Sequence, residues 1–373
     1  MFFISIVKID RNLISILVGC VLCFLDRLIN YYYEALIFEN SILTDIIVSI
    51  SYIFTFIPLV IIKFRSKITK IDNKEIIEDN KLNYIYTKAK IKIIKGKRIL
   101  ILLSAIIIFI QSILFMFSFQ IKTNAWIVEI LFTSIFYYLI FNQKLYKHHY
   151  LSVVLIILLG LIINLVLGNL QKDISENLLY LLIRLLREIL ISLNDVIDKY
   201  IIEKKFVSIY EISFFVGLID LILLSIFAVL DYYFFGINNF EKYFNNFHFE
   251  ELLVILGIMI TQLGIYISIL YTNKNYTPCH IFIIFVVGNI AHCLDFSINS
   301  IIVLICLIFI LFFALIFNEI IEINFWGLSD NTKRNIRNRA ESEDIENISI
   351  LTTDTLTEME EKTIDLNENE IYK

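Results

Sequence analysis

Long apolar segments alternate with short polar ones along the chain up to about residue 320. A membrane-spanning helix needs about 20 mostly apolar residues, and ten segments approach or exceed that length. They cover 12–37, 41–62, 98–120, 124–142, 150–170, 177–199, 208–235, 250–272, 278–295 and 297–318. The pattern predicts an all-α, polytopic membrane protein of about ten transmembrane helices. We expect Pro58 to kink the second helix and Pro278 to lie in the first turn of the ninth.

Composition supports a membrane protein. Of 373 residues, 58% are hydrophobic and 18% are charged, whereas soluble domains contain roughly 45–50% apolar and about 25% charged residues. Cys20 and Cys23 form a CxxC inside a predicted helix, and we interpret them as packing residues rather than metal ligands. The sequence contains no HExxH, nucleophile elbow or phosphate-binding loop. We therefore expect neither an enzyme nor a cofactor or metal site.

Basic residues are concentrated in alternate loops, which predicts the orientation of the chain. Segment 63–98 contains twelve Lys and Arg residues, and the loops after the fourth, sixth and eighth helices are also basic. The intervening loops have at most one basic residue each. This alternation places both termini in the cytosol. We expect segment 63–98 to lie on anionic lipid headgroups rather than to bind nucleic acid, and His148 and His149 to be solvated in a cytosolic loop.

Two stretches indicate an internal repeat: "LDRLINYYYE" (25–34) and "NDVIDKYIIE" (194–203). Aligned at one offset, they share Asp26 with Asp195, Tyr31 with Tyr200 and Glu34 with Glu203. They end the first and sixth predicted helices, so 1–170 and 171–320 would each contain five helices. Because five is odd, the second half would start on the opposite side of the membrane, as an inverted repeat. The acidic, Ser/Thr-rich remainder, 321–373, is expected to be a disordered cytosolic tail.

Two passages resemble the drug/metabolite transporter superfamily (EamA-type), on the branch of nucleotide-sugar and related solute carriers. They are "FTSIFYYLIFNQKLYKHHYLSVVLIILLGLIINLVLG" (132–168) and "NDVIDKYIIEKKFVSIYEISFFVGLIDLIL" (194–223), and the resemblance covers about residues 12–320. It implies a central cavity surrounded by helices 1–4 and 6–9, in an endomembrane such as the ER, Golgi or vacuole rather than the plasma membrane. It leaves a homodimer open. That branch usually has a lysine motif in the ninth helix, where this chain has "GNIAHCLDF", so we transfer no substrate residue.

The stretch "LLIRLLREILISLNDVIDKY" (181–200), which makes up most of the sixth predicted helix (177–199), has a charged face. At 100° per residue its charges lie within an arc of roughly 160°. A charge near the bilayer centre costs about 2.5–3.5 kcal/mol, so this face should point toward protein or water. Arg184 and Glu188 are four residues apart and can pair, which leaves Arg187 and Asp195 for other partners. The face is interpreted as part of a solute path, with a structural ion-pair network as the alternative.

Other polar residues within predicted spans are assigned to the same cavity. They are Asp26, Arg27, Gln111, Glu129, Gln262, His292 and Asp295. Interhelical hydrogen bonding is the alternative role for each, and His292 is spaced to contact Asp295. Ser208 and Glu211 have the spacing of a capping box at the start of the seventh helix.

The predicted function is secondary transport of a small polar or anionic metabolite by alternating access. The arginines of the sixth helix suit a carboxylate or phosphate group, because a guanidinium binds such groups with two parallel hydrogen bonds. A non-transporting membrane scaffold or receptor is the main alternative. A multi-pass membrane enzyme is less favoured.

Overall fold

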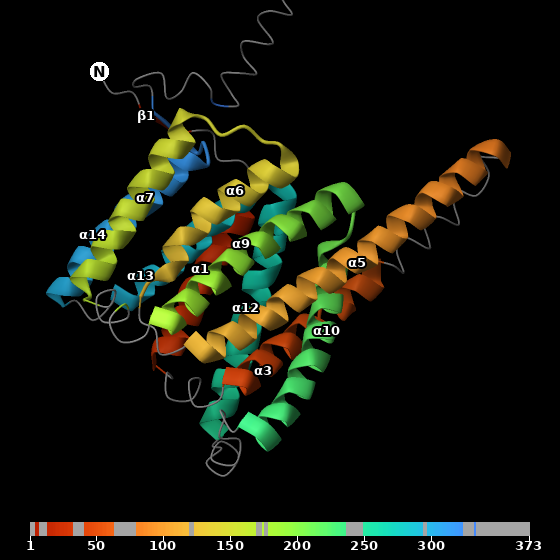
Figure 1. Cartoon of the computed structure of the whole chain (residues 1–373), viewed down its shortest axis with the longest axis horizontal. Helices are drawn as coiled ribbons and strands as arrows, with labels where there is room; N and C mark the ends of the chain where they lie inside the picture. Colours follow the sequence, from red (N-terminus) through yellow and green to blue (C-terminus); the bar gives the residue numbers. More distant parts are fainter. Residues whose placement is uncertain are drawn as a thin grey trace, which may run out of the picture.

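A computed structural model of the chain describes residues 4–6, 13–32, 41–62, 80–118, 123–168, 174, 178–235, 249–293, 297–323 and 332. Most of these residues are helical, and the helices pack side by side in one bundle (Figure 1). Their bounds are α1 Ile14–Tyr32, α3 Ser41–Ile53, α5 Asn80–Ser118, α6 Glu129–Phe141, α7 Lys147–Val166, α9 Leu178–Lys205, α10 Ile209–Leu230, α12 Phe249–Asn275, α13 Ile281–Ile290 and α14 Ile298–Phe317.

Short irregular turns extend several of these helices. The 3₁₀ turn η2 (Ala125–Val128) leads into α6, and a π-helical turn, η3 (Asp231–Phe235), continues α10. The 3₁₀ turns η4 (Pro278–His280) and η5 (Ala291–Cys293) flank α13. Each of the ten predicted apolar segments therefore contains one helix of the described chain. The all-helical class predicted from hydropathy is confirmed, apart from one short pair of strands.

Among the described residues, six helical stretches are long and apolar enough to cross a membrane. They are Ile42–Ile62, Gly96–Ser118, Lys147–Val166, Ile209–Tyr233, Leu252–Asn275 and Ile298–Phe317. Two shorter apolar stretches, Ala125–Phe141 and Pro278–Cys293, lie between them in the chain. Large apolar side chains also face outward, since Ile260 is 67% and Ile298 is 79% exposed. These features fit an integral, multi-pass membrane protein.

Both prolines have the local effect expected of them. Helix α3 ends at Ile53, a turn follows at Phe54 and Thr55, and helical structure resumes from residue 56 to 62. Pro58 has no N–H to donate to the carbonyl four residues earlier, so the series of backbone hydrogen bonds along the helix is interrupted there. Pro278 lies in the first turn of η4, where a missing N–H has no cost.

Helix α5 begins earlier than predicted. Segment 63–98 was expected to be a loop, but α5 starts at Asn80 and its N-terminal part projects beyond the other helices (Figure 1). Hydropathy detects only the apolar part of α5, Gly96–Ser118. Lysine is a good helix former, and residues 80–95 contain neither glycine nor proline, so the basic stretch continues the helix. The preceding residues, 63–79, lie outside the described chain.

A small antiparallel strand pair joins the two ends of the helical region. Strand β1 (Ile4–Ile6) pairs with β2 (Ile321–Ile323), with Ile4 opposite Ile323. Because β1 precedes α1 and β2 follows α14, the chain enters and leaves the bundle at the same end. This arrangement requires an even number of crossings between them.

Buried apolar residues form two clusters. One surrounds α13 and includes residues of α1, α7 and α14, and the other lies among α5, α9, α10 and α12. Gly288 permits close packing in the first cluster, since a Cβ there would clash with the Sγ of Cys23. Cys20 and Cys23 are both buried in this cluster, where they pack among apolar side chains.

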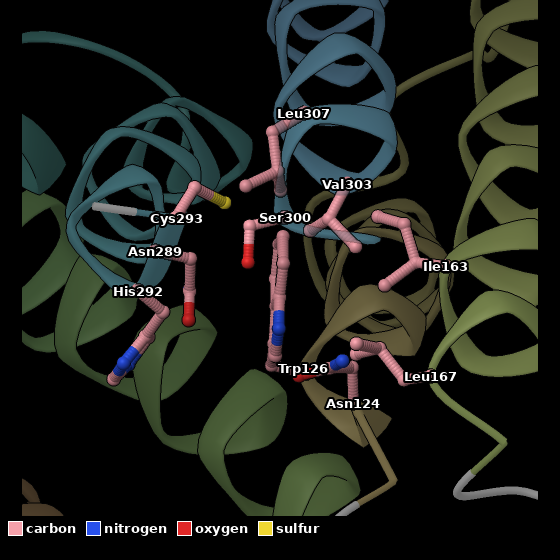
Figure 2. Close-up of a pocket in the computed structure, with 10 residues that line it drawn as sticks. All are labelled: Asn124, Trp126, Ile163, Leu167, Asn289, His292, Cys293, Ser300, Val303 and Leu307. Atoms are coloured by element: carbon pink, nitrogen blue, oxygen red, sulfur yellow. The ribbon is translucent and has the colours of Figure 1, made fainter. Parts of the chain in front are cut away.

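Two cavities of about 110 Å³ lie among the short helices α6 and α13 and their neighbours α7 and α14. The first is lined by Asn124, Trp126 and His292, among others (Figure 2). The second is lined by His149, His280 and Glu319, among others. The first cavity is near the start of α6 and the end of α7. The second is near the end of α6 and the start of α7, so the two cavities lie at opposite ends of these helices.

Candidate functional site

The charged face of α9 points into the protein. Helix α9 contacts α5, α6 and α12, and Glu188, Asp195, Asp198 and Lys199 are all less than 10% exposed. The opposite side of α9 includes Leu182, which is 54% exposed. The N-terminal half of the helix therefore separates charged and apolar side chains as its sequence predicts, whereas every residue from Asn194 to Lys199 is buried, including Ile197.

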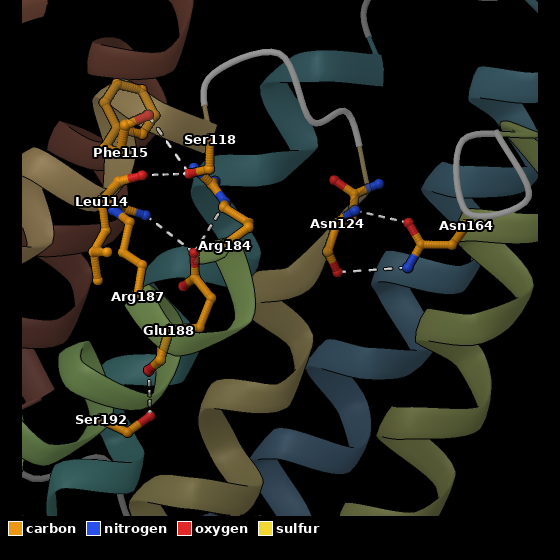
Figure 3. A network of polar contacts seen from close by, with 9 residues as sticks. All are labelled: Leu114, Phe115, Ser118, Asn124, Asn164, Arg184, Arg187, Glu188 and Ser192. Atoms are coloured by element: carbon orange, nitrogen blue, oxygen red, sulfur yellow. Dashed lines mark hydrogen bonds and ion pairs between the residues drawn. The ribbon is translucent and has the colours of Figure 1, made fainter. Parts of the chain in front are cut away.

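Two arginines share one carboxylate near the N-terminal end of this face (Figure 3). The Nε of Arg184 lies 3.2 Å from Oε1 of Glu188, which confirms the predicted pair. Nη1 of Arg187 lies 3.0 Å from the same oxygen, so Arg187 also pairs with Glu188, whereas the sequence had left it for a different partner. Both guanidinium groups also lie over the ring of Phe115, at 5.5 and 5.0 Å from its centroid. The aromatic face adds a cation–π attraction.

A third arginine, Arg27 of α1, adds to this cluster and acts electrostatically on Arg184. The Nε atoms of Arg27 and Arg187 are buried without a hydrogen-bond partner among the described residues, and the Nε of Arg184 has only its 3.2 Å ion pair with Glu188. A buried N–H without an acceptor costs about 1–3 kcal/mol. The three guanidinium groups, which we call the arginine cluster, therefore have hydrogen-bond donors available for an oxyanion.

Glu129 and Ser192 continue the polar face toward the middle of α9. Glu129 is buried in the first turn of α6 and interacts electrostatically with Glu188, Arg187 and Asp195. The hydroxyl of Ser192 lies within hydrogen-bond distance of the main-chain oxygens of Glu129, at 3.1 Å, and Glu188, at 3.0 Å. The predicted site residue Glu129 is thus brought together with the α9 cluster.

Further along α9, Asp198 is fully buried against α5. The Oγ of Ser104 lies 2.9 Å from Oδ1 of Asp198 and 2.9 Å from Oδ1 of Asn194. Nδ2 of Asn194 donates to Oδ2 of Asp198 at 3.4 Å. Asp195, which was predicted to be a site residue, has one carboxylate oxygen without a hydrogen-bond partner among the described residues.

Asp26 of α1 has a similar environment. Its Oδ1 accepts a hydrogen bond from Thr261 of α12 at 2.9 Å, and its Oδ2 accepts one from Asn30 at 3.1 Å. Asp26 is 4% exposed. Asp26 and Asp198 therefore each accept one hydrogen bond from a hydroxyl group on another helix. Each also accepts one from the side-chain amide of an asparagine four positions away on its own helix.

The remaining predicted site residues are more dispersed. Gln111 and Gln262 are half-buried on α5 and α12. Gln262 is a hydrogen-bonding neighbour of the Asp26 carboxylate, whereas Nε2 of Gln111 has no hydrogen-bond partner in the described structure. His292 lines the first cavity beside Asn124 and Trp126 (Figure 2), rather than the face of α9. Its predicted contact with Asp295 is not tested, because Asp295 lies outside the described residues.

Several polar partners were not predicted from the sequence. Ser104 and Thr261 donate to buried carboxylates, and Ser49 of α3 donates to Asp220 of α10 at 2.6 Å. A single hydroxyl in an apolar helix often bonds its own helix instead, as Ser118 does to the carbonyl of Leu114. No sequence signal separates these two uses.

Two predictions about local structure are wrong. Ser208 is the N-cap residue of α10, but its side chain makes no capping hydrogen bond, and Glu211 instead pairs with Lys97 of α5 at 2.7 Å. His148 and His149 are in the first turn of α7 rather than in a solvated loop, and His148 is only 3% exposed. In both cases the partner comes from a distant segment of the chain: Lys97 pairs with Glu211, and Glu319 lies beside His148.

Comparison with known proteins gives no match, either to a protein-family model or to an individual curated protein. The functional assignment therefore depends on the geometry of the chain itself.

Proposed function

We propose that this chain is a secondary transporter that moves a small polar or anionic metabolite by alternating access. The observation that supports this most is the polar row along α9, from Arg184 to Lys199. At about 1.5 Å per residue it extends roughly 22 Å, most of the thickness of a bilayer core. Buried charges in a membrane are costly and mark ion or solute paths more often than packing sites.

The helix contacts support two inverted five-helix halves. The first half contains α1, α3, α5, α6 and α7, and the second contains α9, α10, α12, α13 and α14. If the helices are matched in this order, each contact between helices of different halves has an equivalent contact when the two halves are exchanged. Helix α1 contacts α12 and α13, while α9 contacts α5 and α6. Helix α5 contacts α10, and α12 contacts α3. The pairs α3–α10 and α7–α14 relate equivalent helices to each other. Exchanging the halves thus preserves these contacts.

Hydrogen bonds support the same equivalence. Asp26 of α1 accepts from Thr261 of α12, and Asp198 of α9 is bonded to Ser104 of α5; exchanging the halves converts the first pair of helices into the second. The sequence alignment instead paired Asp26 with Asp195. The hydrogen bonds place the equivalent residue three positions later, close to one helical turn.

An asparagine also makes an equivalent bond in each half. Asn164 near the end of α7 bonds the main chain of Asn124, beside η2 (Figure 3). Asn318 at the end of α14 donates to the main-chain oxygen of Cys279 in η4, at 3.2 Å. Both bonds join the end of the fifth helix of a half to the start of the fourth. The even number of crossings implied by the β1–β2 pair is consistent with ten spans.

The charges on α9 favour a solute with an anionic group. The N-terminal part of α9 has two arginines for one directly paired glutamate. Arg27 adds a third positive charge, which the neighbouring Asp26 offsets in part. Guanidinium groups bind carboxylates and phosphates through parallel hydrogen bonds. We further propose that both termini are cytosolic, in an endomembrane, with the basic segment 63–98 on anionic headgroups.

A scaffold or receptor without transport activity is the alternative function. Glu188 neutralises part of the arginine cluster, and Asp45 and Glu129 both interact electrostatically with Arg187. If these acids neutralised the cluster fully, its role would be to hold helices together. The unsatisfied Nε donors favour a site that is completed by a solute.

Uptake into proteoliposomes distinguishes these functions. Purified protein would be tested with a panel of labelled carboxylates and phosphate esters, comparing the wild type with Arg187→Gln. Lys204→Gln is the matched control, because Lys204 is an exposed cation on the same helix, paired with Glu203 at 3.4 Å. Uptake that requires Arg187 but not Lys204 supports the proposal. Binding of a solute without any uptake would favour a receptor, and a chemically altered solute would favour an enzyme.

A further inference from the structure

Three side chains that commonly bind metals meet at one end of the bundle, apart from the arginine cluster. His148 and His149 are in the first turn of α7, and Glu319 follows Asn318, the C-cap residue of α14. One potential ligand atom from each of the three lies within 4.8 Å of the others. Helices α7 and α14 pack against each other, so the three residues are held together by the bundle.

His148 is the most enclosed of the three. It is 3% exposed, and neither of its ring nitrogens has a hydrogen-bond partner in the described part of the chain. Its Nε2 lies 3.4 Å from Oε1 of Glu319, and its ring centroid lies 4.0 Å from that of His149. A buried imidazole usually satisfies both nitrogens, so this site has an unused ligand atom.

The backbone at Glu319 gives a second, independent indication. Glu319 has φ +58°, and the N–H groups of Glu319 and Ile320 bond the carbonyls of Ile316 and Leu315. This helix end strongly favours glycine, because a side chain costs about 1–2 kcal/mol in the left-handed region. Helix α7 ends with Gly168 at φ +66°. A glutamate in this strained position of α14 places its carboxylate beside His148.

We propose that His148, His149 and Glu319 bind a divalent transition-metal ion of the zinc class. Zinc accepts imidazole nitrogen and carboxylate oxygen at about 2.0–2.2 Å, which separates two tetrahedral ligands by roughly 3.3–3.6 Å. The 3.4 Å between His148 and Glu319 agrees with this spacing. The second cavity, which His149 and Glu319 line, has room for a water molecule as the fourth ligand.

His149 already uses one of its two ring nitrogens. Its Nδ1 accepts the main-chain N–H of Tyr146 at 3.0 Å, so a metal bound at Nδ1 would take that lone pair from the N–H. No such exchange is required of Nε2 of His148. We therefore expect His148 and Glu319 to contribute most of the affinity, and His149 to contribute less. The bound ion would connect the start of α7 to the end of α14.

Zinc binding to the purified full chain tests this proposal. The protein, in detergent and without any polyhistidine tag, would be titrated with ZnCl₂ by calorimetry, with MgCl₂ as the comparison. We expect one zinc ion per chain, no magnesium binding, and a rise in melting temperature of roughly 2–4 °C at zinc concentrations about tenfold above the dissociation constant. His148→Ala should abolish the rise, and His149→Ala should weaken binding.

Glu319→Gly is the most informative variant. Glycine relieves the positive φ, so without zinc this variant should melt at or above the wild-type temperature, and with zinc it should show no further rise. This result separates loss of a ligand from loss of folding. The proposal is wrong if the wild type binds no zinc, because His148 and Glu319 then form only an ion pair. It is also wrong if Glu319→Gly and His148→Ala bind zinc as the wild type does. Neither outcome depends on whether the chain transports a solute.

Discussion

Helices α1 and α9, the first helices of the two proposed halves, share one polar feature and differ in another. Each has a buried aspartate that is hydrogen-bonded to a hydroxyl from the other half: Asp26 to Thr261, and Asp198 to Ser104. Only α9 adds two arginines around a glutamate. A feature that both halves repeat is expected to hold the bundle together, whereas the feature present in one half is the better candidate for solute recognition.

The comparison assumes that the halves are inverted, and labelling from the two sides of the membrane gives an all-or-none test. Single cysteines would replace Lys90, Lys144 or Asn239; the five native cysteines are buried. Positions 90 and 144 should react with an impermeant maleimide from the cytosolic side, and position 239 only from the opposite side. If positions 90 and 239 react from the same side, the ten-span arrangement is wrong.

Removing the acid at the centre of the arginine cluster should have the largest effect on stability. Glu188→Leu leaves two half-buried guanidinium groups, 20% and 23% exposed, without their shared carboxylate. Breaking a fully buried pair costs about 3–5 kcal/mol, which is the upper bound for this variant. Thermal unfolding in detergent would measure the loss. Lys204→Leu, on the exposed end of the same helix, should change the melting temperature little, because Lys204 is 52% exposed and its pair with Glu203 lies at the surface. Equal effects of the two variants would show that the cluster contributes no buried ion pairs.

Arg187→Gln tests recognition rather than packing. Losing a charge-assisted hydrogen bond to a solute costs about 1.5–3 kcal/mol, or roughly a 10- to 150-fold loss of affinity. Uptake of an anionic solute should fall accordingly while the protein remains folded, and Arg187→Lys should restore part of it, because lysine keeps the charge without the planar fork. A loss of uptake that follows the melting temperature in both variants would assign the arginines to structure.

The repeated aspartate sites should respond alike. Ser104→Ala and Thr261→Val each remove a hydroxyl from a buried carboxylate, with an expected cost of about 1–3 kcal/mol in the free energy of unfolding. Similar shifts in melting temperature, with solute affinity unchanged, would support equivalent structural roles. If only one variant impaired transport, the two sites would not be equivalent.

The smallest effect is expected outside the two halves. Truncation after Arg339 removes most of the acidic tail, which follows the last helix of the second half. Folding and intrinsic transport should be unchanged in proteoliposomes, although abundance in cells can differ. Loss of transport by a stable truncated protein would mean that the tail is part of the transport mechanism.

Hydropathy was sufficient to locate the helices but not the full length of each one. The apolar part of α5 was predicted, whereas its start at Asn80 was not, because a lysine-rich helix outside an apolar segment has no hydropathy signal. The pair Arg184–Glu188 was predictable because both residues are on one helix, four positions apart. Its second partner, Arg187, adjoins Glu188 in sequence, and helical spacing alone does not predict that contact.

The sequence by itself determined the apolar helices, the break at Pro58 and the inward direction of the α9 charges, because helix periodicity and the cost of exposing charges act locally. Only the tertiary structure decided which side chains meet across helices. Ser104 reaches Asp198 over 94 positions, and Thr261 reaches Asp26 over 235. His148 is buried beside Glu319 because α7 packs against α14. Such contacts depend on how distant helices pack together, and one sequence contains no periodic signal for that.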